Sequence, residues 1–416
     1  MGFFDELEEE HKKDGMFTES DVGVSYSIGF PIIDQQLGFR QKIELPDGST
    51  ITQTRIGVPA GTITMNVGPS SSGKSTGCCQ MAYNVIAPFG EDSTLVIFDA
   101  EEAWEPQRIM DINGIDRYEY KQRVRLINDL SLMTFENTLA TIYDICMKKE
   151  SDKERFTYNT GFKNIHGEDI IYYVPTSIVI DSLMKIVPKE VNDEIDKMDA
   201  ATIAMRNAIR RGNWMSKLVG LARKYNINIF IVNHLGSDIP MPGASKGKQL
   251  TFIPTGKNVP GGDKVLYYTT SLLVNIPINS KDGIKTEDES GYNGLPIRLT
   301  VSKSRSGPGG KSALIEFVQE SGFDLRLTLM NFAKENGLIA GRNPSCYFID
   351  NPDVKFDTRQ FVKEITENPD ILKALYKACK PLLNDLIRDA IDEDDPIHGR
   401  KAKKTARDLY NEMMSD

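Results

Sequence analysis

Short apolar runs alternate with longer amphipathic stretches through the middle of the chain. The runs are TITMNV (62–67), TLVIFDA (94–100), RVRLI (123–127), SIVID (177–181) and INIFIVNH (227–234). Most of them lack polar alternation, which is typical of strands buried on both faces of a sheet. The stretches between them have helical character, over about 74–87, 105–112, 134–149 and 200–224. Strands that alternate with helices predict an α/β fold, with a largely parallel sheet flanked by helices.

The flanking segments follow other patterns. Residues 3–14 predict a short charged helix, and residues 41–59 and 155–173 predict hairpins. Residues 235–262 are rich in Gly, Pro, Ser and Lys and lack periodicity, which favours a functional or disordered loop. Beyond it we expect three edge strands, antiparallel to their neighbours, at 265–276, 297–304 and 312–318. From about residue 325 the pattern becomes helical, with one hairpin near 346–356. These patterns predict an N-terminal segment with a hairpin insert (1–59), a core (60–324), a small α+β C-terminal domain (325–390) and a charged tail (391–416).

Composition and charge restrict the class of protein. Forty per cent of residues are hydrophobic and 26% are charged, as in ordinary soluble proteins. Neither a signal peptide nor a membrane-spanning run is visible, and the five cysteines form no C-x-x-C pair. We therefore expect a reduced, cytoplasmic protein without zinc or disulfides. The net charge of −9 argues against a general nucleic-acid coat, so any such contact needs local basic loops.

The strongest chemical signal is GPSSSGKS, which fits the phosphate-binding motif G-x-x-x-x-G-K-[ST] between a predicted strand and a predicted helix. In this motif, backbone N–H groups surround phosphates, Lys74 reaches the β- and γ-phosphates, and the Ser75 hydroxyl binds Mg²⁺. The alternative interpretation is a chance turn. The predicted ATP site comprises Gly68, Pro69, Ser70, Ser71, Ser72, Gly73, Lys74, Ser75 and Thr76.

Polar residues also end three other predicted strands. Asp181 follows SIVI, where a carboxylate beside a phosphate loop anchors Mg²⁺; the alternative is a loop cap. Glu101 follows TLVIFDA and is a candidate base for the attacking water, or else one charge on a solvated turn. His234 and Asn233 end INIFIVNH and could sense the γ-phosphate, or simply cap the strand.

Several of these segments together resemble the RecA recombinase family. The resemblance lies in GPSSSGKST, FDAEEAWEP, IDSLMKIVPK, MSKLVGLARKYNINIFIVNH, GGDKVLYY and FDLRLTLMNFAKENGLI, within about 60–390. His234, where bacterial members usually carry Gln, and VSKSRS (301–306) are similar to the phage UvsX-type branch, which implies a bacterial host cytoplasm. Arg108 stands near the sequence position where bacterial members of the family carry a Tyr that stacks on adenine. The hairpins at 41–59 and 155–173 have no counterpart that we can place.

The resemblance implies filaments on single-stranded DNA, with ATP and Mg²⁺ between protomers. Double-stranded DNA, single-strand-binding proteins and mediator proteins are the other candidate partners, and a membrane is not. The N-terminal segment would serve oligomerisation. Lys303 and Arg305 would reach the ATP of a neighbouring subunit; alternatively, they mark a basic edge strand. DNA would meet loops at about 186–203 and 235–260 and the helix after the first loop, where Arg206, Arg210 and Arg211 could equally form a solvated face. The DNA-contact candidates are Lys189, Arg206, Arg210, Lys246, Lys248, Phe252 and Lys257.

Four functions compete on this sequence. The first is a DNA strand-exchange recombinase with DNA-dependent ATP hydrolysis. A hexameric helicase shares the same motifs but usually has a separate N-terminal domain, and fewer than 60 residues precede this core. An accessory recombinase paralogue would normally have lost residues such as Lys74 or Glu101. A small-molecule kinase fits least, because no lid-like arginine cluster is apparent.

Overall fold

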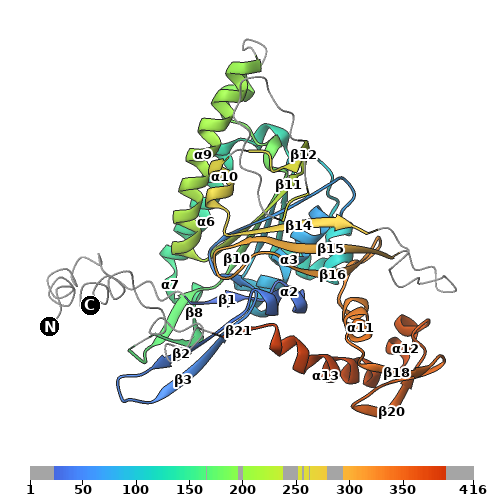
Figure 1. Cartoon of the computed structure of the whole chain (residues 1–416). Coiled ribbons are helices and arrows are strands. Elements are labelled where there is room, and N and C mark those ends of the chain that lie inside the picture. Colours follow the sequence, from blue (N-terminus) through green and yellow to red (C-terminus); the bar gives the residue numbers. More distant parts are fainter. Residues whose placement is uncertain are drawn as a thin grey trace, which may run out of the picture.

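A nine-stranded sheet forms the centre of the part of the chain that the structure describes (Figure 1). The structure is a computed structural model that describes residues 23–164, 166–194, 200–237, 252–254, 257–261, 263–278 and 294–389. The strand order is β17-β16-β15-β14-β5-β11-β10-β6-β7. In chain order the strands are β5 (Ile63–Gly68), β6 (Leu95–Asp99), β7 (Val124–Ile127), β10 (Thr176–Asp181), β11 (Ile227–His234), β14 (Ser271–Pro277), β15 (Gly294–Ser304), β16 (Lys311–Val318) and β17 (Gly322–Asp324).

The six strands from β14 to β7 are parallel, and β15, β16 and β17 extend the sheet antiparallel. Helices cover both faces, so successive side chains of a central strand enter two different cores. In β6, Leu95 and Ile97 join the core under α3, whereas Val96 and Phe98 join the core under α6 and α9. This double burial explains the continuous apolar runs and confirms the predicted α/β fold. The main covering helices are α3 (Lys74–Ile86), α4 (Pro106–Asn113), α5 (Arg117–Arg123), α6 (Phe135–Ser151), α9 (Ala200–Tyr225) and α10 (Asp263–Tyr268).

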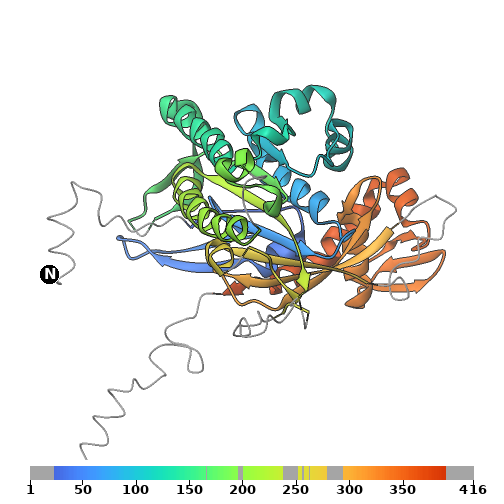
Figure 2. The ribbon, with the colours of Figure 1, turned by 90° about the horizontal axis from the view of Figure 1, so that it is seen from above.

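The C-terminal elements lie at the end of the molecule away from α9 (Figure 2). The predicted hairpin near 346–356 is part of a three-stranded antiparallel sheet, β18-β19-β20. Leu329, Phe348 and Leu375 belong to the same apolar core as Val301 and Ile315 of the central sheet. The hydrophobic core on the α3 face therefore continues into this region. Its elements are α11 (Leu325–Glu335), β18 (Ile339–Arg342), β19 (Ser345–Phe348), β20 (Asn351–Phe356), α12 (Phe361–Glu367), α13 (Pro369–Asp385) and β21 (Arg388–Asp389).

The two hairpins without a counterpart pack against each other. The Gln53 side-chain amide donates to Lys163 O (2.7 Å) and its carbonyl accepts from Lys163 N (3.1 Å). The Tyr26 and Tyr158 hydroxyls lie 2.8 Å apart. Strand β21 pairs with β2, so three distant segments form one lobe. The elements here are β1 (Ser25–Tyr26), α2 (Pro31–Gln36), β2 (Phe39–Glu44), β3 (Thr50–Arg55), β4 (Val58–Pro59), α7 (Lys153–Phe156), β8 (Thr157–Lys163) and β9 (Asp169–Tyr173).

Two of the expectations for the segment 265–276 are wrong. Residues 263–268 form α10, and the strand β14 begins only at Ser271. Strand β14 is also parallel to β5, so the antiparallel edge begins at β15. A six-residue helix is too short for its period to be read from the apolar pattern. The predicted helix at 3–14 and the charged tail at 391–416 lie outside the described residues.

Short elements complete the described chain. They are η1 (Ala87–Asp92), η2 (Leu130–Leu132), η3 (Leu183–Lys185), α8 (Lys189–Glu194), β12 (Gly236–Ser237) and β13 (Lys257–Asn258). Among the described helices, none combines the length and the apolar character that a membrane span needs.

Candidate functional site

The loop between β5 and α3 curls around the N-terminus of α3. Gly73, directly before the helix, has φ 70°, and Ser71 has φ 58°. A Cβ on Gly68 would lie 2.5 Å from both Asn275 O and Ser72 Oγ, so glycine is required for this close approach. The first N–H groups of a helix have no partner within the helix, and the helix dipole favours anions there. The loop therefore has the geometry of a phosphate cradle.

Lys74 begins α3 and lies largely buried beside this loop. Its Nζ donates to Pro69 O at 2.6 Å. Burial lowers the pKa of Lys74, and the nearby carboxylates of Asp181 and Glu101 oppose that effect. A cavity of about 670 Å³ opens next to it. Ser71, Ser72, Gly73, Lys74, Ser75 and Thr76 line one side, and Arg108, Leu295, Phe317 and Gln319 line the rest.

Asp181 ends β10 and is 1% exposed. Trp104 Nε1 donates to its Oδ2 at 3.0 Å, whereas Oδ1 is buried without a hydrogen-bond partner. Burial raises the pKa of Asp181, and the Trp104 N–H and the Ser75 hydroxyl, which lies near the carboxylate but outside hydrogen-bond geometry, oppose the increase. A carboxylate and a hydroxyl are ligands that Mg²⁺ prefers, and an unsatisfied buried carboxylate oxygen is a place for a cation. Ser75 and Asp181 therefore fit the predicted metal site.

Glu101 lies on the loop after β6, opposite the end of β11. The Ser182 hydroxyl donates to its Oε1 at 2.7 Å, and His234 Nε2 lies 3.4 Å from the same oxygen. Partial burial alone would raise the pKa of Glu101, but the hydrogen bonds from Ser182 and His234 outweigh it and lower the pKa. A carboxylate that stays ionised is suited to accept a proton or orient a water.

The end of β11 is tied to the base of the long loop that follows it. Asn233 Nδ2 donates to Pro260 O at 2.8 Å, and its Oδ1 accepts from His234 N at 2.9 Å. Gly236 and Ser237 pair with Asn258 and Lys257, so β12 and β13 close the loop at its base. Helix α10 begins soon after, at Asp263. Hydrogen bonds therefore connect Glu101, through β11, to both ends of the loop.

The sequence of this chain is similar to those of several known proteins. RecA of Lactococcus lactis subsp. cremoris strain MG1363 is 24% identical over 342 residues, 79% of this chain and 73% of that protein. RecA of Pseudomonas savastanoi pv. phaseolicola is 23% identical over 331 residues, 79% of this chain and 77% of the relative. RecA of Clostridium novyi strain NT is 23% identical over 354 residues, 84% of each chain. No protein-family model matches.

The chain is similar to RecA proteins. The likeness extends over about four fifths of its length. At this identity it supports kinship with the RecA family and a RecA-like core. It does not distinguish a branch within the family.

The lining of the cavity beside Lys74 includes Arg108, a predicted nucleotide-binding residue. Arg108 Nη1 donates to Glu320 O at 2.6 Å, which ties α4 to the turn between β16 and β17. Phe317 and Leu295 add apolar surface to the same cavity, and Gln319 adds an amide. Sequence reasoning did not find these three residues. They are about 200 residues from Arg108 in the chain, and only sheet extension by β15 and β16 brings them to this cavity.

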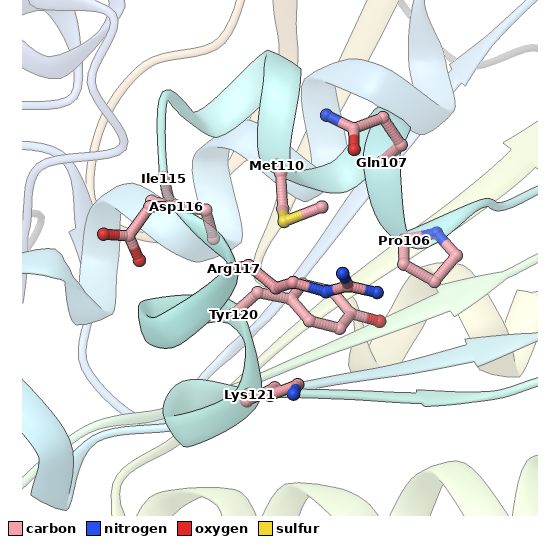
Figure 3. A pocket seen from close by; sticks show the side chains of 8 residues that line it. All are labelled: Pro106, Gln107, Met110, Ile115, Asp116, Arg117, Tyr120 and Lys121. Atoms are coloured by element: carbon pink, nitrogen blue, oxygen red, sulfur yellow. The ribbon is translucent and has the colours of Figure 1, made fainter.

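A second hollow of about 550 Å³ lies on another face of α4 (Figure 3). Met110 lines it from α4, and Arg117, Tyr120 and Lys121 line it from α5. All of its lining residues come from 106–121, whereas the cavity beside Lys74 includes residues from β15 and β16. The hollow is therefore separate from the phosphate loop.

Lys303 and Arg305 lie far from the phosphate loop of their own chain. Lys303 aligns with Leu272, which aligns with Met65, and Arg305 N donates to Thr270 O beside Ile63. The phosphate loop follows Gly68, which is five residues after Ile63 along β5. Arg305 is therefore roughly 15 Å from the phosphate loop along the sheet. Lys303 Nζ donates to Thr269 O (2.7 Å) and to Leu266 O, and Arg305 donates to Tyr267 O. Both cations therefore close the C-terminal end of α10.

The described DNA-contact candidates fall into two groups, Lys189, Arg206 and Arg210 around Glu190, and Phe252 and Lys257 near the base of the long loop. Lys189 is exposed at the start of α8, and Arg210 is paired with Glu190 (Nη2–Oε2 3.1 Å). Arg206 is half-buried on α9. Phe252 and Lys257 are exposed near the base of the long loop, and the Phe252 ring lies against Gly310. Lys246 and Lys248 lie outside the described residues.

One arginine of the trio on α9 does not fit the DNA interpretation. Arg211 is only 5% exposed and lies over the ring of Phe135, 6.0 Å from its centroid. Helix α6 covers this side of α9, so position 211 faces the protein while position 210 faces solvent. A repeat of arginines along a sequence cannot reveal which one a neighbouring helix covers.

Proposed function

We propose that this chain is an ATP-dependent DNA strand-exchange recombinase of the phage UvsX-type branch, working as a filament on single-stranded DNA. The likeness to RecA proteins supports the family. The observation that carries the proposal is the hydrogen-bonded path from Glu101 through His234 and Asn233 to Pro260. It joins a hydrolytic site to the base of the loop that would bind DNA, which is the connection a DNA-dependent ATPase needs.

Each residue of the site has a chemical task in ATP hydrolysis. The N–H groups at the start of α3 and the Lys74 ammonium would bind the phosphates, and Arg108, Phe317 and Gln319 would enclose the base. Ser75 and Asp181 would hold Mg²⁺, which would neutralise charge on the β- and γ-phosphates. Glu101 would orient the attacking water and accept its proton. Ser182 and His234 hold the carboxylate of Glu101 in place for that step.

Lys303 and Arg305 point to a site shared between subunits. They are too far from their own phosphate loop to act on its ATP, so any ATP they contact belongs to another copy of the chain. A cation that approaches the γ-phosphate from a neighbour stabilises charge that develops in the transition state. Because both residues close α10, which follows the long loop, ATP binding at the interface would also affect that loop.

DNA would be held by the loop segments and by the start of α9. The lysines of the second loop are point charges for phosphates, and Phe252 offers a ring that can stack on a base. The ATP state would change the position of His234 and thereby the order of the second loop, which would set DNA affinity. Double-stranded DNA and accessory single-strand-binding proteins are the further partners we propose.

The test is ATP hydrolysis measured with and without single-stranded DNA, with negative-stain images of the same samples. DNA-stimulated turnover together with helical filaments is the expected result. Closed rings would indicate a motor of the helicase type. Turnover that DNA does not change, without filaments, would contradict the proposal.

The DNA-contact residues can be tested through salt dependence. Changing Lys246, Lys248 and Lys257 together to Ala should weaken single-stranded DNA binding at low salt. The slope of log affinity against log salt should fall by about 2, because three phosphate contacts are lost. Lys121→Ala, on the separate hollow of Figure 3, serves as the control. An unchanged slope would move the DNA site to another surface.

A further inference from the structure

The loop from Asp99 to Trp104 folds back on itself and directs an indole at Asp181. The Asp99 carboxylate accepts from Ala103 N (3.2 Å) and Trp104 N (2.9 Å). Ala100 N donates to Asp181 O at 2.6 Å. The loop is therefore closed at both ends, by its own first residue and by the strand beside it. These hydrogen bonds fix the position of the Trp104 backbone.

Trp104 is 7% exposed and belongs to the apolar core on the α3 face. The one polar group of its side chain, the indole N–H, donates a hydrogen bond to Oδ2 of Asp181. Hydrogen bonds to an ionised acceptor are stronger than neutral ones, and a buried carboxylate depends on them most. Packing holds the ring, and its hydrogen bond restrains Oδ2 of Asp181.

The two oxygens of Asp181 consequently differ. Oδ2 is occupied by Trp104, whereas Oδ1 is buried and has no hydrogen-bond partner. We propose that Trp104 is a positioning residue that holds Asp181 so that Oδ1 is the oxygen presented to a divalent cation, directly or through a bound water. This inference rests on the proposed function, because the cation is the Mg²⁺ that accompanies the nucleotide.

The same loop also carries Glu101, three residues before Trp104. Ser182, the residue after Asp181, donates to Glu101, while Trp104 donates to Asp181. Asp181, the last residue of β10, and Ser182, which follows it, are thus each hydrogen-bonded to a side chain of the loop after β6. The carboxylates of Glu101 and Asp181 are therefore each tied by a hydrogen bond between the two neighbouring strand ends.

The test uses the change Trp104→Phe, which keeps an aromatic ring and removes the N–H. Trp214→Phe is the matched control, since Trp214 is the other tryptophan of the chain, is also buried, and donates to Thr138 Oγ1 at 3.1 Å. Binding of a fluorescent ATP analogue to the full chain is measured as Mg²⁺ is varied, and again in EDTA. For Trp104→Phe, the Mg²⁺ concentration at half-maximal effect should rise about tenfold, as expected for loss of one hydrogen bond to a charged group. Binding in EDTA should be unchanged, and Trp214→Phe should match the wild type in both.

The outcomes separate this inference from the function beneath it. If the wild type binds the analogue with Mg²⁺ dependence and Trp104→Phe has the same midpoint, the positioning role is wrong and the ATP site stands. Equal losses with Mg²⁺ and in EDTA would show that Trp104 only supports the fold. If the wild type shows no Mg²⁺-dependent binding, both proposals fail.

A second measurement decides the matter even if Trp104→Phe does not fold. In Trp214→Phe, Trp104 is the only tryptophan left, so its emission can be followed alone. With nucleotide bound, Mg²⁺ should change that emission in a saturable way, with the midpoint found in the binding assay. Emission that does not respond to Mg²⁺ would overturn the inference.

Discussion

The two ends of the parallel sheet carry charged side chains in very different surroundings. At the carboxyl end, Lys74 lines the cavity, and the carboxylates of Glu101 and Asp181, from two other strand ends, lie close enough to raise its pKa. Hydrogen bonds there join side chains of different elements. At the other end, Lys303 and Arg305 donate to backbone carbonyls at the C-terminal end of α10. The first arrangement is assembled within one chain. The second offers cations whose chemical target, on our proposal, is in a neighbour.

This difference suggests that variants at the two ends should fail in different ways. A change at the carboxyl end should disable the site of the chain that carries it. A change at the other end should disable the site of a neighbouring chain. Mixing experiments can therefore distinguish the two ends when single variants cannot.

The largest effect should follow from Lys74→Ala. It removes the ammonium that would bind the phosphates, so ATP hydrolysis should fall about 1,000-fold or more. Steady-state phosphate release measures it, with Lys121→Ala as a lysine control outside the cavity. Undiminished hydrolysis would remove the phosphate-loop assignment.

Glu101→Gln should separate binding from chemistry at the same end. The neutral amide keeps the size of the side chain but cannot accept a proton, so turnover should fall about 100-fold. Affinity for a fluorescent ATP analogue should stay at the wild-type value, and DNA should remain bound because ATP persists. Loss of nucleotide affinity instead would give Glu101 a structural role.

Arg305→Ala should lower turnover between about 10-fold and 100-fold, and mixing should locate its target. A mixture with Lys74→Ala should recover part of the activity. Some sites then combine an intact Lys74 from one chain with an intact Arg305 from the next. If Arg305 served its own chain or only capped α10, the mixture would be as inactive as its components.

The smallest effect, and the most specific for pH, should follow from Ser182→Ala. Burial raises the pKa of Glu101 and the Ser182 hydrogen bond lowers it, so loss of the hydroxyl should move that pKa upward. Turnover should fall about threefold in the acid range where Glu101 titrates and recover as pH rises above it, because the ionised form of Glu101 is the active one. Ser151→Ala, an exposed serine that donates only to Lys148 O among the described contacts, is the control. An unchanged acid limb would disconnect Ser182 from Glu101.

The central sheet could be predicted because burial on both faces leaves an unmistakable apolar run. Residues 177–181 and 227–234 were expected as strands and are β10 and β11. The helix α10 was missed because six residues show too little of a 3.6-residue period. The burial of Arg211 was missed because it depends on α6, which is about 60 residues earlier in the chain.

The same limit applies to the site. Asp181 and Glu101 could be singled out because each ends an apolar strand. Ser182 directly follows Asp181 and Trp104 is three residues after Glu101, but nothing in a linear pattern indicates that β6 and β10 are neighbours in the sheet. Their roles depend on distances across strands, and those distances exist only after the strands have paired.

The sequence by itself determined the fold class, the phosphate loop and the strand ends that carry charge, because these are local properties of composition and period. Only the tertiary structure decided which of those charges meet. It placed Glu101 beside Ser182 and His234, and it brought the Trp104 N–H within hydrogen-bond distance of one oxygen of Asp181. It also separated Arg305 from the phosphate loop of its own chain. The physical reason is that strand order and helix packing set contacts between residues far apart in the chain, and hydrogen bonds act only over about 3 Å.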